Sequence, residues 1–202
     1  MGKVVEKRME RFLGDLRRSP VVPTVRSDGK PLEEALAEEH PAILVLGGNI
    51  FDLTRRIGGG KRRTQIFVNV DLIGGIAGDK NGIGFLSEHV EGIVSTNRQV
   101  IERANSTDLI TVQRLFAIDT TAMERGLKLV RRTKPRCVEI LPALAYPRMA
   151  SSYSELLDRP VLAGGFVTSE EELSRILDAG AVGVSTSHEA LWKHTVDSGV
   201  KS

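Results

Sequence analysis

Residues 160–188 read PVLAGGFVTSEEELSRILDAGAVGVSTSH, and this stretch predicts strands and helices in alternation. The apolar run Val161–Ala163 ends at Gly164–Gly165, which is typical of a short strand buried in a parallel sheet. Ser169 is followed three residues later by Glu172, a spacing that caps the first turn of a helix. The stretch therefore begins with a strand, a glycine turn and a helix.

A second unit of the same kind follows directly. Ala181–Val184 is predicted to be a strand, and the hydroxyl side chains of Ser185, Thr186 and Ser187 then precede a short helix at Ala190–Trp192. A glycine turn and a hydroxyl turn at a helix N-terminus can both direct backbone N–H groups at one anion. In a (β/α)8 barrel the phosphate site lies in the loops after strands 7 and 8. The predicted phosphate-binding residues are therefore Gly164, Gly165, Ser185, Thr186 and Ser187.

The rest of the chain repeats this alternation. Eight apolar runs are predicted to be strands: Val21–Val25, Ala42–Leu46, Ile66–Leu72, Gly92–Ser95, Leu109–Leu115, Cys137–Leu141, Val161–Ala163 and Ala181–Val184. Helical periodicity follows each of them, and eight such units favour a closed TIM-type (β/α)8 barrel over an open doubly wound sheet, which uses the same alternation. The predicted fold class is α/β, with residues 1–18 as an N-terminal helical extension and residues 19–202 as a single barrel domain.

Composition narrows the class of protein further. The 202 residues are 41% hydrophobic, which is enough for the core of one globular domain. A net charge of +2 does not by itself require a polyanionic partner. Cys137 is the single cysteine and cannot form an internal disulfide, which fits a reducing compartment. Because no apolar run approaches the ~18 residues that span a bilayer and no secretory signal precedes the barrel, we expect a cytoplasmic protein without membrane contact.

Three charged residues, Asp71, Arg114 and Glu139, fall near the ends of predicted strands. Buried charges are costly unless they are paired, so these residues need partners. Either they pair with one another across the barrel mouth, or the carboxylates accept hydrogen bonds from ligand hydroxyls while Arg114 or the glycine turns hold an anion. A small phosphorylated polyol satisfies the second interpretation. No metal-ligand spacing and no dinucleotide-binding or Walker motif occurs, so neither a metal nor a cofactor is predicted.

Several polar and apolar segments occur in an order that resembles a known family. They are Val70–Ile73, Gly92–Thr96, Ile110–Phe116, Asp119–Glu124, Val138–Pro142, Leu162–Phe166, Gly180–Ser187 and Leu191–Trp192. In this order they resemble the glycerol uptake operon antiterminator regulatory proteins, and the likeness runs from about Pro20 to Trp192. The runs Gln-Arg-Leu-Phe and Val-Glu-Ile-Leu-Pro are unusual for barrel strands and make the resemblance specific.

The resemblance implies a TIM-barrel protein that binds glycerol 3-phosphate and then binds a messenger RNA leader, so that genes for glycerol uptake and use are transcribed. It would be a regulator without catalytic residues. Gly164, Gly165, Ser185, Thr186 and Ser187 would hold the phosphate, and Asp71, Arg114 and Glu139 would surround the glycerol moiety. The alternative is a barrel enzyme for phosphate esters, an isomerase, lyase or phosphodiesterase, with Asp71 and Glu139 as acid and base. Turnover of a phosphorylated substrate distinguishes the two.

RNA binding requires a basic surface, and three patches of the sequence could provide one. The N-terminal helix carries Lys3, Lys7, Arg8, Arg11, Arg17 and Arg18, which Glu6, Glu10 and Asp15 dilute. The other two patches are clusters in turns that enter predicted strands. The candidate RNA-binding residues are Arg55, Arg56, Lys61, Arg62 and Arg63 in one cluster, and Arg131, Arg132, Lys134 and Arg136 in the other. Both clusters are also compatible with solvated helix ends. In the N-terminal helix, an apolar stripe that includes Val5, Phe12 and Leu16 predicts that the helix covers the lower end of the barrel, at the amino ends of the strands, or forms a homodimer contact.

Overall fold

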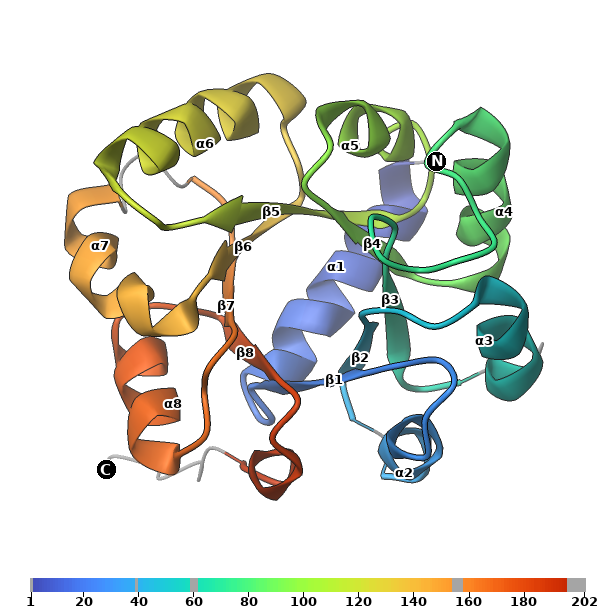
Figure 1. The fold of residues 1–202 in the computed structure, drawn as a ribbon, viewed down its shortest axis with the longest axis horizontal. Helices are drawn as coiled ribbons and strands as arrows, with labels where there is room; N and C mark the ends of the chain where they lie inside the picture. The colour runs from blue at the N-terminus through green and yellow to red at the C-terminus, as the bar shows by residue number, and fades with distance from the viewer. Residues whose placement is uncertain (1, 39, 59–61, 154–157, 196–202) are drawn as a thin grey trace.

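The computed structural model describes residues 2–38, 40–58, 62–153 and 158–195. Within these ranges eight parallel strands close into a barrel with helices packed around it (Figure 1). The strands are β1 (Val21–Val25), β2 (Ala42–Val45), β3 (Gln65–Asn69), β4 (Gly92–Ser95), β5 (Ile110–Phe116), β6 (Cys137–Leu141), β7 (Val161–Gly164) and β8 (Gly183–Thr186). The α-helices are α1 (Gly2–Leu16), α2 (Pro31–Ala37), α3 (Ile50–Ile57), α4 (Lys80–His89), α5 (Arg98–Ala104), α6 (Thr120–Thr133), α7 (Tyr146–Tyr153) and α8 (Glu170–Asp178). Two short 3₁₀ helices are η1 (Ala143–Ala145) and η2 (Glu189–Leu191).

Closure of the sheet confirms the predicted TIM-type barrel. Each strand pairs in parallel with the next one, and β8 returns to β1, where Val21 lies opposite Val184 and Pro23 opposite Thr186. Strands buried on both faces explain why each predicted strand is a short, nearly continuous apolar run. The carboxyl ends of all eight strands therefore meet at one end of the barrel, which we call the upper end.

The N-terminal helix closes the opposite, lower end. In Figure 1, α1 runs diagonally behind the barrel. Val5, Phe12 and Leu16 on one face of α1 are buried and pack with the inward side chains of the lower half of the barrel. The rings of Phe12 and Phe67 have centroids 4.9 Å apart. The apolar stripe of this helix is thus buried within its own chain, as one of the two predictions required. The homodimer contact stays a prediction.

Strands β2, β3, β5, β7 and β8 differ from the predicted boundaries by one to three residues, and the differences are largest at β3 and β8. Strand β3 stops at Asn69, because the side-chain oxygen of Asn69 accepts a hydrogen bond from the N–H of Asp71 (2.9 Å) and turns the chain. Strand β8 begins two residues later than expected, so Ser185 and Thr186 belong to the strand. The helix expected at its end is the single 3₁₀ turn η2.

Candidate ligand site at the upper end of the barrel

A cavity of about 430 Å³ opens at the upper end. This volume lies in the range of about 300–1,000 Å³ that is usual for small-molecule sites. The cavity is lined by Thr24, Leu46, Arg114, Glu139, Leu141, Gly165, Phe166, Val167, Thr168, Ser185, Thr186, Ser187 and His188. Strands β1, β2, β5, β6, β7 and β8 or the loops after them thus contribute to one hollow, and most of the predicted ligand residues lie in or beside it.

Glu139 forms the floor of this cavity together with two partners. The guanidinium Nε of Arg114 donates to Glu139 Oε2 at 2.7 Å, and the hydroxyl of Ser185 donates to Glu139 Oε1 at 2.6 Å. The side chains of Arg114 and Glu139 are only 8% and 1% exposed. Arg114 and Glu139 therefore pair with each other, and their role toward a ligand stays a prediction. The terminal nitrogens of Arg114 have no acceptor among the described residues, so their N–H groups are available to a ligand.

Gly164 acts through its missing side chain. A Cβ at this position would collide with the hydroxyl of Ser185 and would lie 2.9 Å from Glu139 Oε1. The hydrogen bond from Ser185 to Glu139 therefore requires glycine between strands β6 and β8. Gly164 does not line the cavity itself, whereas Gly165, the next residue, does.

The loop after β7 has an unusual backbone. Gly165 and Phe166 have φ angles of +86° and +65°, values that suit glycine and are costly for phenylalanine. Both residues line the cavity. The N–H groups of Phe166 and Ser187 donate to no acceptor among the described residues. Unsatisfied N–H groups beside a cavity can bind an anion.

Helix α8, which follows this loop, does not offer its N-terminus to a ligand. Ser169 and Glu172 form the predicted capping box. The carboxylate of Glu172 accepts hydrogen bonds from the backbone N–H groups of Thr168 and Ser169, and these bonds lower the pKa of Glu172. Three glutamates in the first turn further disfavour an anion there.

The hydroxyl residues after β8 divide into different roles. Thr186 is buried, donates its hydroxyl to the carbonyl of Val167 (2.8 Å) and accepts from the N–H of His188 (3.0 Å). These bonds join the loops after β7 and β8. Ser185 is occupied by Glu139, and Ser187 is exposed at the cavity. The turn does not lead into an α-helix, so the helix-dipole part of the predicted phosphate site is wrong for the described residues.

Asp71 is not brought to this cavity. Its carboxylate accepts hydrogen bonds from the N–H (2.6 Å) and hydroxyl (2.8 Å) of Thr96 and from the hydroxyl of Ser95. These contacts join the end of β3 to the end of β4, and Asp71 is absent from the described lining of the cavity. The prediction that Asp71 lies with Arg114 and Glu139 around one ligand is therefore not met, because neighbouring hydroxyls already occupy its carboxylate.

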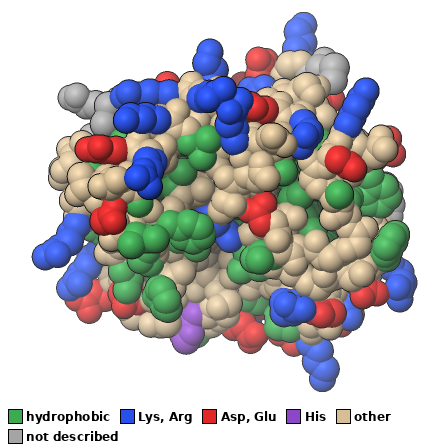
Figure 2. Space-filling view, turned by 45° about the horizontal axis from the view of Figure 1, so that its top comes forward, with side chains coloured by type: hydrophobic (Ala, Val, Ile, Leu, Met, Phe, Trp, Pro, Cys, Tyr) green, Lys and Arg blue, Asp and Glu red, His purple; other side chains and the backbone are tan. Residues whose placement is uncertain are grey.

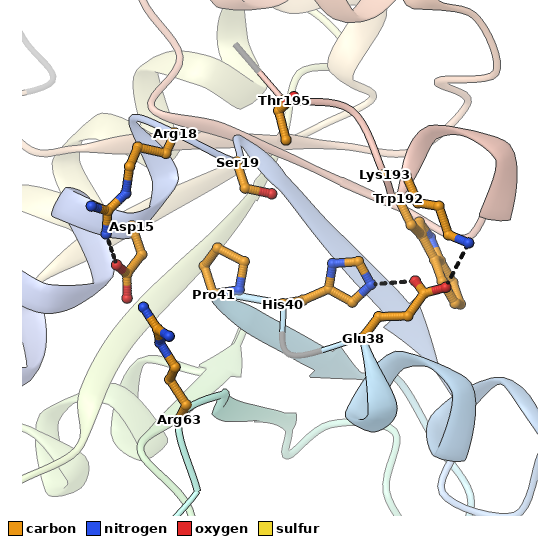
Figure 3. Close-up of a pocket in the computed structure, with 10 residues that line it drawn as sticks. All are labelled: Asp15, Arg18, Ser19, Glu38, His40, Pro41, Arg63, Trp192, Lys193 and Thr195. Carbon is orange, nitrogen blue, oxygen red and sulfur yellow. Dashed lines mark hydrogen bonds and ion pairs between the residues drawn. The ribbon is translucent and has the colours of Figure 1, made fainter. Parts of the chain in front are cut away.

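A second hollow, of about 550 Å³, lies near the amino ends of β1 and β2 (Figure 3). Most of its charged side chains are paired: Arg18 with Asp15 (2.7 Å) and Lys193 with Glu38 (3.0 Å), while His40 is hydrogen-bonded to Glu38 (3.0 Å). Arg63 also lines the hollow and forms no ion pair with a described carboxylate. Burial lowers the pKa of His40 against the opposing effect of Glu38. Because functional sites of such barrels lie at the carboxyl ends of the strands, the upper cavity is the candidate ligand site.

The two predicted RNA-binding clusters lie on different sides of the barrel. Figure 1 shows α3, which carries Arg55 and Arg56, on the opposite side from α6. Arg55 pairs with Asp52 (2.9 Å), Arg56 with Glu33 (3.9 Å), and Arg62 with Glu91 (3.2 Å). Arg63 lies at the lower hollow (Figure 3), and Lys61 falls outside the described residues.

The cluster at the end of α6 is different, because its cations are not paired. Arg131, Arg132 and Lys134 are exposed, Arg136 is half-buried, and none of them forms an ion pair with a carboxylate in the described part of the chain. Arg125 and Lys128 extend this face along α6. The sequence-based prediction missed these two residues, although Lys128 is three residues from Arg125 and from Arg131 and four from Arg132, a spacing that places them on one helix face.

The described residues, 2–38, 40–58, 62–153 and 158–195, contain neither a metal-binding cluster nor a membrane-spanning helix. No group of three or more His, Cys, Asp or Glu side chains in these ranges is arranged to hold a metal ion. No helix within them is long and apolar enough to cross a membrane.

Comparison with known proteins gives a consistent family. The sequence profile described as glycerol-3-phosphate responsive antiterminator matches residues 21–192. Uncharacterized protein YgcP of Escherichia coli K12 is 31% identical over 180 residues, covering 88% of this chain and 93% of YgcP. The crystal structure of a glycerol uptake operon antiterminator regulatory protein from Listeria monocytogenes has a TM-score of 0.76 at 27% identity, covering 86% of this chain and 95% of that one.

A glycerol uptake operon antiterminator-related protein from Thermotoga maritima is also similar, with a TM-score of 0.73 at 25% identity and coverage of 88% of this chain and 99% of that one. Enzymes share the architecture at lower identity. One aldolase is 10% identical with a TM-score of 0.64, covering 85% of this chain and 91% of the aldolase. A likeness of that kind shows the fold alone.

Proposed function

The chain belongs to the glycerol-3-phosphate responsive antiterminator family, and we propose that it binds glycerol 3-phosphate in the upper cavity and thereby controls its binding to a messenger RNA leader. On this proposal the protein is a regulator of genes for glycerol uptake and use. It binds its ligand and releases it unchanged.

The observation that carries the proposal is the buried group Arg114–Glu139–Ser185 beside a glycine turn. Arg114 presents N–H donors and Glu139 a carboxylate acceptor, which together match hydroxyl groups, since each hydroxyl both donates and accepts. The N–H groups of Phe166 and Ser187, with Gly165 giving close backbone access, match the phosphate. A molecule with adjacent hydroxyls and one phosphate fits both halves.

The enzyme alternative receives less support from the geometry. It required Asp71 and Glu139 to act on one substrate, yet Asp71 is bound to Ser95 and Thr96 outside the described lining of the cavity. Glu139 itself is already hydrogen-bonded through both oxygens. A carboxylate held in this way suits recognition of a ligand better than proton transfer.

Calorimetric titration tests the ligand half of the proposal. We expect glycerol 3-phosphate to bind, and glycerol or inorganic phosphate alone to bind far more weakly. Ser185→Ala removes the hydroxyl bound to Glu139 and should weaken binding at least about ten-fold, the effect of losing roughly 1.4 kcal/mol. Ser87→Ala is the matched control, because its hydroxyl only contacts the carbonyl of Gly84 in α4.

Two further readouts separate a regulator from an enzyme. Phosphorus NMR of a mixture with glycerol 3-phosphate should show no new signal over hours, and consumption of the ligand would favour the enzyme instead. Filter binding to the leader transcript of the organism's own glycerol operon should change when glycerol 3-phosphate is added. A protein that binds neither the ligand nor this RNA contradicts the proposal.

A further inference from the structure

The outer face of α6 carries a stripe of unpaired cations, which we call the α6 basic face. It consists of Arg125, Lys128, Arg131, Arg132 and Lys134. All five side chains are exposed, and none forms an ion pair with a described carboxylate. Glu124 is the single acidic residue of the helix. Lys and Arg side chains are frequent along the upper part of the face shown in Figure 2.

Cations elsewhere differ in their pairing: Lys3, Lys7 and Arg11 on α1 are also exposed and form no ion pair with a described carboxylate, whereas many other arginines are paired. Arg55, Arg56, Arg62, Arg98 and Arg175 are each matched to a carboxylate on their own or a neighbouring element. Exposed cations without such partners raise the local positive potential and attract a polyanion. The α6 basic face therefore has the charge that a nucleic acid backbone requires, whereas the α3 cluster is largely neutralised.

An apolar rim lies at the upper end of the same side of the barrel. It consists of Phe116, Ile118, Leu144 and Phe166, which are 48%, 79%, 45% and 78% exposed. Phe116 ends β5 and lies opposite Leu141 of β6, while a Cβ at Gly165 would be 3.9 Å from the same leucine. The end of β5 and the loop that carries Phe166 therefore both lie beside Leu141. Ile118 lies between Phe116 and the start of α6. Apolar side chains are visible below the basic ones at the left of Figure 2.

The rim and the ligand cavity share a residue. Phe166 lines the cavity and has a positive φ angle of +65°. Backbone strain of this kind persists only where surrounding contacts hold it. A ligand that fills the cavity would therefore contact the loop of Phe166.

We propose that a single-stranded segment of RNA lies along α6, with its phosphates on the α6 basic face and its unpaired bases stacked on Phe116 and Phe166. Proteins read RNA sequence mainly in single-stranded regions, by stacking unpaired bases on aromatic side chains. This inference rests on the proposed function and adds to it the surface, the strandedness of the RNA and a route by which the ligand acts. Because Phe166 belongs to both sites, filling the cavity sets the position of one stacking platform.

The phosphate half is tested by removing charge. The variant Arg125→Gln/Lys128→Gln/Arg131→Gln/Arg132→Gln should bind the leader transcript of the organism's own glycerol operon more weakly, with glycerol 3-phosphate present. The slope of log affinity against log salt concentration should fall by about 3, because each phosphate contact on a single strand contributes about 0.7. The matched control Arg55→Gln/Arg56→Gln should keep the wild-type slope.

The stacking half is tested by removing rings. Phe116→Ala and Phe166→Ala should each weaken binding of this transcript by about 5- to 100-fold, the range found for a lost base–aromatic stack, and should leave the salt slope unchanged. Phe51→Ala is the control, since the exposure of Phe51 (61%) lies between those of Phe116 and Phe166 but it belongs to the first turn of α3, on the other side of the barrel. Thermal unfolding followed by circular dichroism shows whether each variant still folds, and Phe116→Ala should keep its ligand affinity in the absence of RNA.

The outcomes separate this inference from the proposed function. If the wild-type protein does not bind the transcript at all, the RNA part of the proposed function fails. If the wild type binds and the α6 variant binds with the same affinity and salt slope, the inference is overturned while the function stands. Equal binding of duplex DNA or of vesicles rich in anionic lipid, with the same dependence on α6, would also overturn it, because the face would then be a general polyanion surface.

Discussion

The two ends of the barrel are built from the same eight strands and have opposite character. At the lower end α1 inserts Val5, Phe12 and Leu16 against apolar inward side chains. At the upper end the inward positions hold a buried ion pair, Arg114 with Glu139, above which a cavity opens. Buried charges add little to stability even when paired. On the proposed function, the lower end therefore supplies stability and the upper end supplies ligand recognition.

Inside the barrel, the apolar layer at the lower end gives way to the charged residues of the upper end within two residues of a strand. In β6, Cys137 packs in the apolar lower layer and Glu139, two residues later on the same face, holds Arg114. In β5 the corresponding residues are Val112 and Arg114. Because side chains alternate between the two faces of a strand, two residues are the smallest distance over which an apolar interior can become a polar site. Ligand chemistry can thus be changed without disturbing the lower layer.

The largest expected effect comes from a substitution in the apolar lower end, which tests whether stability and ligand binding depend on different ends of the barrel. Phe12→Ala removes a ring that is 1% exposed and stacked near Phe67. We expect the free energy of unfolding to fall by about 3–5 kcal/mol, the usual loss for a buried phenylalanine. Guanidinium denaturation measures this change. The affinity for glycerol 3-phosphate, measured where the variant is folded, should stay within about two-fold of wild type. A loss of affinity as large as the loss of stability would contradict the division between the ends.

A small change at the upper end should have the reverse effect. Gly164→Ala places a Cβ against Ser185 and Glu139, so the hydrogen bond between them must shift. Affinity for glycerol 3-phosphate should fall more than ten-fold, while stability falls by about 1–3 kcal/mol, as for other overpacked positions. Thermal unfolding with and without ligand measures both effects.

The matched control is Gly84→Ala in α4, where a Cβ meets nothing within 4 Å. Alanine is the better helix former by about 1 kcal/mol, so this variant should gain stability and keep its ligand affinity. If Gly164→Ala and Gly84→Ala have the same affinity for the ligand, Gly164 has no role in shaping the site.

The sequence predicts the barrel well because its signals are local. Short apolar runs and caps such as Ser169 with Glu172 depend on neighbours in the chain, and the structure confirms them. The role of Gly164 was predicted less accurately. Its glycine is needed because Ser185 and Glu139, from two other strands, meet beside it. No local sequence pattern predicts that these two side chains come together beside Gly164.

The pairing of the charged residues is also difficult to predict from sequence. Arg62 lies shortly before β3, and Arg132 lies near the end of α6, shortly before β6. Their sequence contexts look alike. Arg62 is paired with Glu91, 29 residues away, whereas Arg132 has no ion-pair partner in the described chain. Asp71 likewise finds Ser95 and Thr96 on the next strand. Which charged side chain is paired depends on its neighbours in the tertiary structure. The number of candidate RNA-binding residues could therefore be reduced only once the structure was known.

The smallest expected effect concerns pH and again contrasts the two ends. At the lower hollow, burial holds the pKa of His40 below its usual value of 6.5, although Glu38 opposes the shift. The unfolded chain therefore binds a proton at this histidine at a higher pH than the folded chain does. It follows that the free energy of unfolding should fall as the pH drops below about 6.5, and that His40→Gln should reduce this fall.

Denaturation at pH 7.5 and 5.5, for wild type and His40→Gln, measures the difference. Glu38, whose pKa is lowered chiefly by its bond to Lys193, titrates below this interval and does not disturb the comparison. Ligand affinity also changes with pH, because a phosphate monoester loses its second proton near pH 6, but it should change equally in both proteins. If the two proteins lost stability in parallel between these pH values, the neutral, buried state assigned to His40 would be wrong. A difference in stability without a difference in affinity would show that titration at the lower end leaves the ligand site unaffected.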